Sequence, residues 1–258
     1  MRENLQEIVQ PLLNWFDQNA RILPWRDQPT PYRVWVSEIM LQQTRVEAVK
    51  PFYQRFMEAL PDIQALAECE EEKLLKLWEG LGYYNRVRNM QIAARTVMSD
   101  YHGVLPDVYT ELLKLKGIGS YTAGAIASIA YGKTAPAVDG NVLRVISRVT
   151  LNREDVLKQS VKRKIEQEMI NIMPVERPGA FNQALMELGA MVCVPNGAPH
   201  CEKCPLKDMC QARLQNVIEE IPVKKAKKPR RIEELTVFIL RDGEHLAIHK
   251  RPKNGLLS

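Results

Sequence analysis

Two carboxylic acids lie in surroundings that could support acid–base chemistry. Glu38 falls in an apolar stretch of predicted helix, where desolvation would raise its pKa and keep a proton available near neutral pH. Asp139 directly precedes Gly140 and another apolar-patterned helix, so backbone N–H groups at that helix start would keep it ionised. Asn141 is its expected hydrogen-bonding partner. On pattern alone, a solvated helical glutamate and a purely structural N-cap stay open as alternatives.

Four cysteines near residue 200 form the second candidate for chemistry. Their spacing is C-x7-C-x2-C-x5-C, and clustering of this kind in a cytosolic chain favours a metal over disulfides. Four thiolates in one short loop could surround either zinc or an iron–sulfur cluster. The alternative is a set of unrelated buried thiols. The residues are Cys193, Cys201, Cys204 and Cys210.

The stretch KGIGSYTAG predicts a helix-hairpin-helix turn. Gly117 and Gly119 would allow backbone angles and a close approach that a Cβ would block, while Ile118 fills the space between the helices. The turn would expose N–H groups beside a helix start, which favours a phosphate. A tight turn followed by closely packed small residues, with Tyr121 as a half-buried aromatic, is the alternative.

The elements that position these residues are predicted to be helices throughout the first 215 residues. Thr30 is the expected N-cap of a helix that begins at Pro31, contains Glu38 and carries apolar residues as far as Val46. Short connections indicate a compact all-α domain. Further helices are predicted at roughly 62–79, 86–101, 108–115, 120–131, 141–150, 158–172 and 179–192.

A change of composition follows the helical part. The segment KKAKKPRR, residues 224 to 231, supplies six positive charges to a net charge of +5, so the rest of the chain sums to 5 − 6 = −1. Overall basicity is therefore weak evidence for nucleic-acid binding. Beyond it, an Asp242-Gly243 turn predicts a β-hairpin. No apolar run approaches the length of a membrane span, which favours a cytoplasmic protein.

Several motifs together resemble the endonuclease III family of DNA glycosylases, and within it the A/G-specific adenine glycosylases. They are LPWR at 23–26, SEIMLQQTRV at 37–46, GLGYYNRVRN at 80–89, GIGSYTAGAI at 117–126, VDGNV at 138–142 and the cysteine loop. The order is that of the family and covers nearly the whole chain. The family usually has six residues between the first two cysteines, whereas this loop has seven.

The resemblance implies roles for individual residues. Glu38 would protonate adenine N7 while Asp139, held by Asn141, stabilises an oxocarbenium-like sugar. Bifunctional relatives carry a lysine at the joint after the hairpin, and Tyr121 cannot form a Schiff base. We therefore expect a monofunctional enzyme in which Tyr121 lines the sugar site and helps to order Asp139.

Residues that contact DNA are implied in the same way. A stacked adenine must be flipped out and its place filled, for which Gln43, beside Thr44, and Tyr83 are the candidates. Hydrogen bonds or stacking to the extruded base would come from Trp25, Arg26 and Gln183. Without the resemblance, each of these residues would be interpreted as a solvated polar residue of the surface or as an aromatic residue of the core.

The resemblance also implies an organisation and a set of partners. A helical lobe over 25–132 would carry the hairpin, and a second lobe, 1–24 with 133–220, would hold one [4Fe–4S] cluster. A basic linker, 221–231, would join them to 232–258, the beginning of a truncated nucleotide-hydrolase-like domain. The expected substrate is double-stranded DNA with adenine opposite 8-oxoguanine or guanine, and the chain would be a monomer. The alternatives are a pyrimidine-lesion glycosylase with lyase activity and a non-catalytic DNA-binding or redox-sensing protein.

Overall fold

The computed structural model describes residues 5–225, 232, 234, 236 and 238–248. The expected linker and C-terminal segment thus lie partly outside the described residues. The expected all-α character is confirmed for the first unit, residues 1–225. Its helices and helical turns are η1 (Leu5–Ile8), α1 (Val9–Asn19), α2 (Pro24–Asp27), α3 (Pro31–Leu41), α4 (Val46–Ala59), α5 (Ile63–Glu68), α6 (Glu71–Trp78), α7 (Asn85–Asp100), α8 (Tyr109–Leu112), α9 (Ser120–Ala125), η2 (Ile126–Ala130), α10 (Gly140–Val149), α11 (Gln159–Ile172), α12 (Pro178–Met191), η3 (Cys201–Lys203), α13 (Gln211–Leu214) and η4 (Ile218–Glu220).

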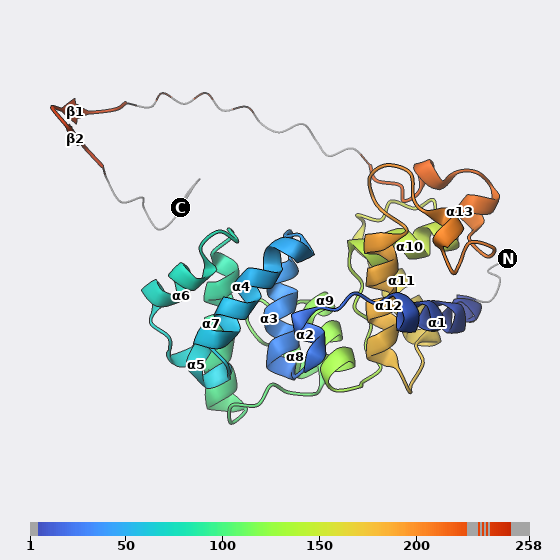
Figure 1. Ribbon diagram of the computed structural model, residues 1–258, viewed down its shortest axis with the longest axis horizontal. Helices are drawn as coiled ribbons and strands as arrows, with labels where there is room; N and C mark the ends of the chain where they lie inside the picture. The colour runs from blue at the N-terminus through green and yellow to red at the C-terminus, as the bar shows by residue number, and fades with distance from the viewer. Residues whose placement is uncertain (1–4, 226–231, 233, 235, 237, 249–258) are drawn as a thin grey trace. The chain divides into compact units, whose positions relative to one another are not determined.

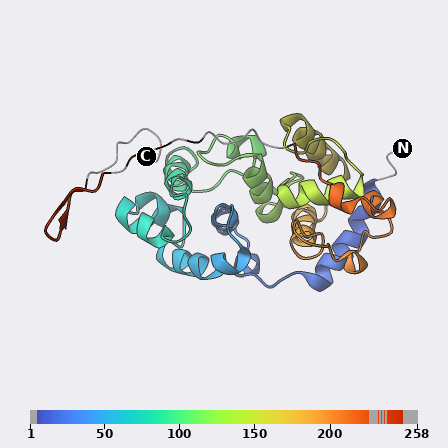
Figure 2. The same cartoon turned by 90° about the horizontal axis from the view of Figure 1, so that it is seen from above.

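Two hydrophobic cores organise these helices. One is built from residues between Leu23 and Ala135, around the fully buried Trp35, Phe56 and Trp78. The other joins α1 to α10, α11 and α12. In both orientations the helices of the two cores lie side by side, with α9 near the junction (Figures 1 and 2). The chain passes from the second core to the first after α1 and returns before α10.

Local signals placed most helix boundaries, and three predictions needed correction. Thr30 caps α3 as expected, its side chain accepting a hydrogen bond from Arg33 N at 3.3 Å. That helix ends at Leu41, however, and α4 is a separate helix. The single helix predicted over 62–79 is two, and the last turns of the 120–131 helix form a π-helix. Apolar periodicity runs on across such breaks, so it could not reveal them.

The helix-hairpin-helix turn has one glycine that needs its conformational freedom. Gly117 has φ +81°, and a Cβ there would lie 2.9 Å from Asn89 Cβ. Ile118 is buried, as predicted. The expectation for Gly119 was wrong, because its φ is −98° and a Cβ would meet nothing within 4 Å. The close packing of the next helix is real, since a Cβ on Gly124 would lie 2.0 Å from Pro136 O.

The second unit, residues 226–258, contains the predicted hairpin in a shorter form. Strands β1 (Arg241–Asp242) and β2 (His245–Leu246) pair antiparallel, with Asp242 opposite His245. The turn therefore consists of residues 243 and 244, one position later than predicted, and Gly243 supplies its positive φ of +57°. Both strands are exposed. Within the described part of the chain, none of the helices has the length and apolar character needed to cross a membrane.

Candidate active site

A cavity of about 1280 Å³ collects most of the residues that the sequence predicted to act together. It brings Glu38 of α3 to Asp139 and Asn141 at the start of α10, although about a hundred residues separate them in sequence. Of the predicted residues, Tyr83, Gly117 and Gly119 do not line it. Those that do are Trp25, Arg26, Glu38, Gln43, Thr44, Tyr121, Asp139, Asn141 and Gln183.

Glu38 is a buried acid of this cavity, with 6% of its surface exposed. The Tyr121 hydroxyl donates a hydrogen bond to Glu38 Oε2 and also approaches Met186 Sδ at 3.5 Å. Burial raises the pKa of Glu38 to about 7, although the bond from Tyr121 opposes this rise and the nearby Asp139 charge adds to it. The carboxyl group is therefore poised to carry a proton near neutral pH. The Tyr121 hydroxyl thus binds Glu38, and the expected role of Tyr121 in ordering Asp139 stays a prediction.

Asp139 is the N-cap of α10, as its sequence context predicted. Its Oδ1 accepts hydrogen bonds from the backbone N–H groups of Asn141 and Val142, both at 2.9 Å. The expected partner contributes a third bond, from Asn141 Nδ2 to Oδ2 at 2.6 Å. Even so, burial outweighs these bonds and raises the pKa of Asp139 above its ordinary value. The hydrogen bonds of the cap oppose this rise without cancelling it, and the expectation that Asp139 stays ionised near neutral pH remains a prediction.

Arg144 connects the Asp139 end of the cavity to the cysteine loop, a link the sequence did not reveal. Its guanidinium donates to Asn141 Oδ1 at 2.8 Å and to Gly189 O at 2.9 Å. A further bond runs from Nε to Cys193 O at 2.7 Å. Buried arginines of this kind fix several backbone segments at once, because one guanidinium offers five donors. Asn141 is thus held from both sides.

A further acid of the cavity, Glu187 on α12, anchors two of its arginines. Arg21 reaches it through Nε at 2.7 Å and NH2 at 2.9 Å, and Arg26 through NH2 at 3.1 Å. Arg26 also donates from Nε to Gln183 Oε1 at 2.9 Å. Burial would raise the pKa of Glu187, but the bonds from the two arginines outweigh it and lower the pKa to about 2. Sequence reasoning missed this acid, although it follows Gln183 at the four-residue spacing of one helix face.

Trp25 has a dual environment. Its side chain is buried and packs edge-to-face against Tyr53, with ring centroids 5.4 Å apart. It also lines the cavity. Trp25 is therefore a core residue with one surface turned toward the candidate substrate space.

The two expected wedge residues lie on loops with left-handed backbone. Gln43 is exposed with φ 61°, directly after the end of α3, and Thr44 follows it with its N–H bonded to Leu41 O at 3.3 Å. Tyr83 has φ 48° and is 66% exposed, a large value for an aromatic side chain. Both side chains are thus free to meet a partner surface, which is what insertion into a base stack needs.

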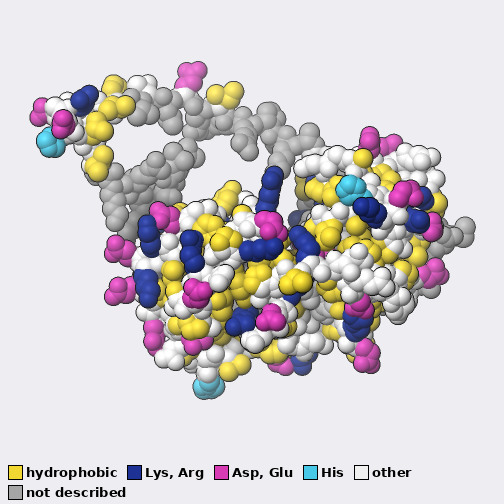
Figure 3. All heavy atoms as spheres, in the orientation of Figure 1, with side chains coloured by type: hydrophobic (Ala, Val, Ile, Leu, Met, Phe, Trp, Pro, Cys, Tyr) yellow, Lys and Arg dark blue, Asp and Glu magenta, His cyan; other side chains and the backbone are white. Residues whose placement is uncertain are grey.

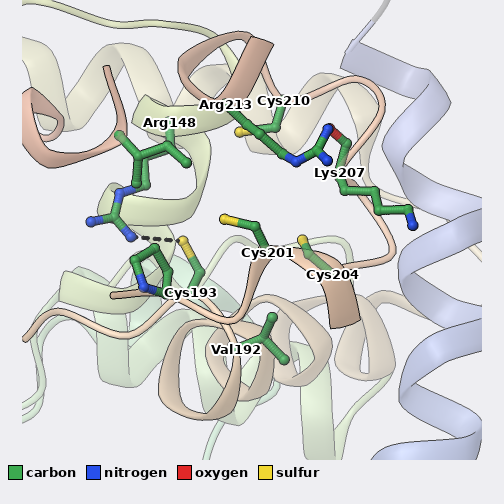
Figure 4. Close-up of a pocket in the computed structure, with 10 residues that line it drawn as sticks. Arg148, Val192, Cys193, Cys201, Cys204, Lys207, Cys210 and Arg213 are labelled. Carbon is green, nitrogen blue, oxygen red and sulfur yellow. Dashed lines mark hydrogen bonds between the residues drawn. The ribbon is translucent and has the colours of Figure 1, made fainter. Parts of the chain in front are cut away.

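The four clustered cysteines line one small pocket (Figure 4). Their sulfur atoms face a common space, and Arg148 NH1 lies 3.2 Å from Cys193 Sγ. Burial and the neighbouring thiols raise the pKa of Cys204 to about 12. In the described part of the chain, no three ligating side chains come close enough to hold a single metal ion. Four thiolates in one loop can hold either one zinc ion or an iron–sulfur cluster.

Charges of both signs cover the face shown in space-filling form, with basic side chains gathered near its middle (Figure 3). At the cavity itself the basic residues are Arg21, Arg26, Arg45 and Lys162. Four acids, Glu38, Glu47, Asp139 and Glu187, line the same cavity, so its formal charges balance and do not by themselves indicate an anionic partner.

Comparison with known proteins accounts for this arrangement. Residues 36–170 match the model of the family described as HhH-GPD superfamily base excision DNA repair protein. The chain is 38% identical over 254 residues to an adenine DNA glycosylase of Buchnera aphidicola subsp. Baizongia pistaciae, covering 96% of this chain and 70% of that protein. It is 44% identical over 218 residues to the adenine DNA glycosylase of Homo sapiens, covering 81% of this chain but 40% of that one.

A solved structure supports the same relationship. This structure, a trapped endonuclease III–DNA covalent intermediate in an estranged-adenine complex, has a TM-score of 0.68 and is 26% identical in sequence. The match covers 82% of this chain and 97% of that one. The fold is therefore of the endonuclease III type.

Proposed function

The chain belongs to the HhH-GPD superfamily of base excision DNA repair proteins, and from this premise we propose that it is a monofunctional adenine DNA glycosylase. Its substrate would be duplex DNA with adenine opposite 8-oxoguanine or guanine. The reaction would be hydrolysis of the N-glycosidic bond of the flipped adenine. The observation that carries the proposal is one cavity in which a buried, protonatable Glu38 faces the same space as Asp139.

The leaving base is activated by a proton. With a pKa of about 7, roughly half of the Glu38 side chains hold a proton at neutral pH. Tyr121 occupies Oε2, which leaves Oε1 to deliver that proton to adenine N7. Protonation turns adenine into a better leaving group, because the electron pair of the broken bond then leaves with a less basic nitrogen.

The sugar left behind is electron-poor, and Asp139 would stabilise it. Bonds from Asn141 and Val142 fix the carboxylate at the start of α10, so little reorganisation is needed as positive charge develops on the sugar. Water then forms the new bond to the anomeric carbon, and the proton it loses returns to the Glu38 carboxylate that protonated the base. Tyr121 carries no amine, which supports a monofunctional outcome and argues against a Schiff-base intermediate.

The cysteine loop would bind one [4Fe–4S] cluster through Cys193, Cys201, Cys204 and Cys210. Hydrolysis transfers no electrons, so the chemistry this group supplies when bound is structural: it fixes the loop. The side chain of Lys207 extends away from the sulfurs (Figure 4), where it could meet phosphate together with Lys203. The helix-hairpin-helix turn at Gly117 would contact the backbone of the same duplex.

The test is a strand-cleavage assay on duplex DNA with adenine opposite 8-oxoguanine, followed by alkali, which cuts at abasic sites. Wild type should produce the alkali-dependent cut, and Glu38→Gln should lower the single-turnover rate on the order of 10³-fold, the range expected for loss of a general acid. Glu47→Gln is the matched control, because Glu47 lines the same cavity with 74% of its side chain exposed. Undiminished cutting by Glu38→Gln would overturn the proposal.

A further inference from the structure

Arg86, near the start of α7, ties together two loops that are distant in sequence. Its NH1 donates to Ile39 O at 2.7 Å and Gln42 O at 2.6 Å, at the C-terminal end of α3. Its NH2 donates to Leu81 O at 3.0 Å and Gly82 O at 3.3 Å. The two amino groups of one guanidinium therefore bind carbonyls of two separate loops, which we call the wedge loops: residues 42–45 and residues 80–84.

The same guanidinium also meets aromatic rings of the second wedge loop and its neighbour. It lies 5.4 Å from the ring centroid of the buried Trp78 and 5.7 Å from that of Tyr83. At such distances a guanidinium is attracted to the face of an aromatic ring. Arg86 thus fixes both the backbone of this loop and the direction of its exposed tyrosine ring.

Backbone geometry explains why the wedge loops need an anchor. Gln43 and Tyr83 both adopt positive φ, which is costly for residues with a Cβ and persists only where the surroundings impose it. The turn after α3 also adjoins a cavity of about 90 Å³, lined by residues that include Gln42 and Arg86. On the side of this cavity, the turn is supported by the Arg86 guanidinium rather than by closely packed side chains.

We propose that Arg86 is a positioning residue that locks the two wedge loops in one arrangement, so that Gln43 and Tyr83 can enter the base stack together. The inference rests on the proposed glycosylase function and adds a requirement for the flipping step. Arginine is needed because its planar fork sends donors in two directions, whereas a lysine ammonium cannot span both sets of carbonyls. Arg86 would then act before the chemistry, at extrusion of the base.

The experiment separates base flipping from bond cleavage. Duplex DNA carries a target adenine opposite guanine, with 2-aminopurine beside it as a fluorescent probe of unstacking, and the protein carries Glu38→Gln so that no base is lost. We expect Arg86→Lys to lower the fraction of flipped adenine on the order of 30-fold, since the free-energy cost of unpairing and unstacking the base must be offset. Arg88→Lys is the control: Arg88 lies on the same helix and pairs at the surface with Glu71.

A second duplex tests positioning against general damage. When the target adenine lies opposite an abasic site, no base pair has to be broken, so Arg86→Lys with Glu38 intact should come within a few-fold of the wild-type cleavage rate. An unchanged 2-aminopurine signal, an equal loss on both duplexes, or failure of Arg86→Lys to fold would each overturn the proposal. Absence of wild-type cleavage at adenine opposite guanine would instead refute the proposed function, and the inference with it.

Discussion

Glu38 and Glu187 line the same cavity from α3 and α12, yet their environments shift their pKa values in opposite directions. Both are buried, and burial raises the pKa of each. Glu38 meets a phenol hydroxyl and the negative Asp139, so its pKa rises to about 7. Glu187 meets two guanidinium groups, which lower its pKa to about 2. Burial makes an acid sensitive to its neighbours, and the charge of those neighbours decides whether it becomes a proton donor or a fixed anion.

The largest effect is expected at the fixed anion. Glu187→Gln removes the counter-charge of Arg21 and Arg26, leaving two half-buried guanidinium groups without their carboxylate, and should lower the free energy of unfolding by about 3 kcal/mol. Glu79→Gln, at an exposed pair with Lys76, should leave the free energy of unfolding nearly unchanged, because solvent screens the pair. Chemical denaturation of both variants measures the difference. An equal loss of unfolding free energy in the two variants would show that the Glu187 ion pairs stabilise the protein no more than an exposed pair does.

The stability difference between wild type and Glu187→Gln should depend on pH. Because the folded pKa of Glu187 is depressed to about 2 from 4.5, its stabilising contribution is present above pH 4.5 and lost as pH falls toward 2. The stability gap between wild type and Glu187→Gln should therefore close on acidification, as unfolding curves at several pH values would show. A gap that stays constant down to pH 2 contradicts the depressed pKa.

Glycosylase activity should depend on pH through the proton donor. The single-turnover rate should fall about tenfold per pH unit above pH 7, because deprotonated Glu38 cannot supply the proton. Single-turnover rates from pH 6 to 9 on one duplex measure this limb. If the same fall in rate above pH 7 persists in Glu38→Gln, a group other than Glu38 controls it.

Burial of Glu38 lowers the stability of the folded protein at pH values where the unfolded chain would ionise this residue. Replacing Glu38 with glutamine should therefore stabilise the protein there. Between pH 4.5 and about 7 the unfolded chain ionises Glu38 while the folded chain does not, so wild-type stability falls as pH rises through this window. Glu38→Gln, which escapes this penalty, should be more stable than wild type by about 2 kcal/mol at pH 8. At pH 4 the two should match. A variant less stable at both pH values would contradict this prediction.

The smallest effect concerns the phenol. Tyr121→Phe removes a hydrogen bond that lowers the pKa of Glu38. The alkaline limb of the rate profile should therefore move to higher pH, with less change in the plateau rate than Glu38→Gln produces. A shift to lower pH, or none, would show that Tyr121 does not control the donor.

Sequence reasoning succeeded where local contacts decide the structure. The side chain of Asp139 caps its own helix through Asn141 and Val142, two and three residues away, and Thr30 does the same for α3. Gly117 needs its positive φ because of the turn in which it lies. Sequence reasoning failed at Gly119, whose backbone conformation is ordinary. It also failed at the break after Leu41, because apolar periodicity continues from α3 into α4.

The sequence by itself determined the helical class, the caps and the family, since these follow from residue types at short spacing. Tertiary structure alone decided that Tyr121 binds Glu38, 83 residues away, and that Arg21 binds Glu187, 166 residues away. It also decided that burial outweighs three hydrogen bonds at Asp139. The physical reason is that desolvation and charge depend on everything packed around a group, and most of those neighbours come from other helices.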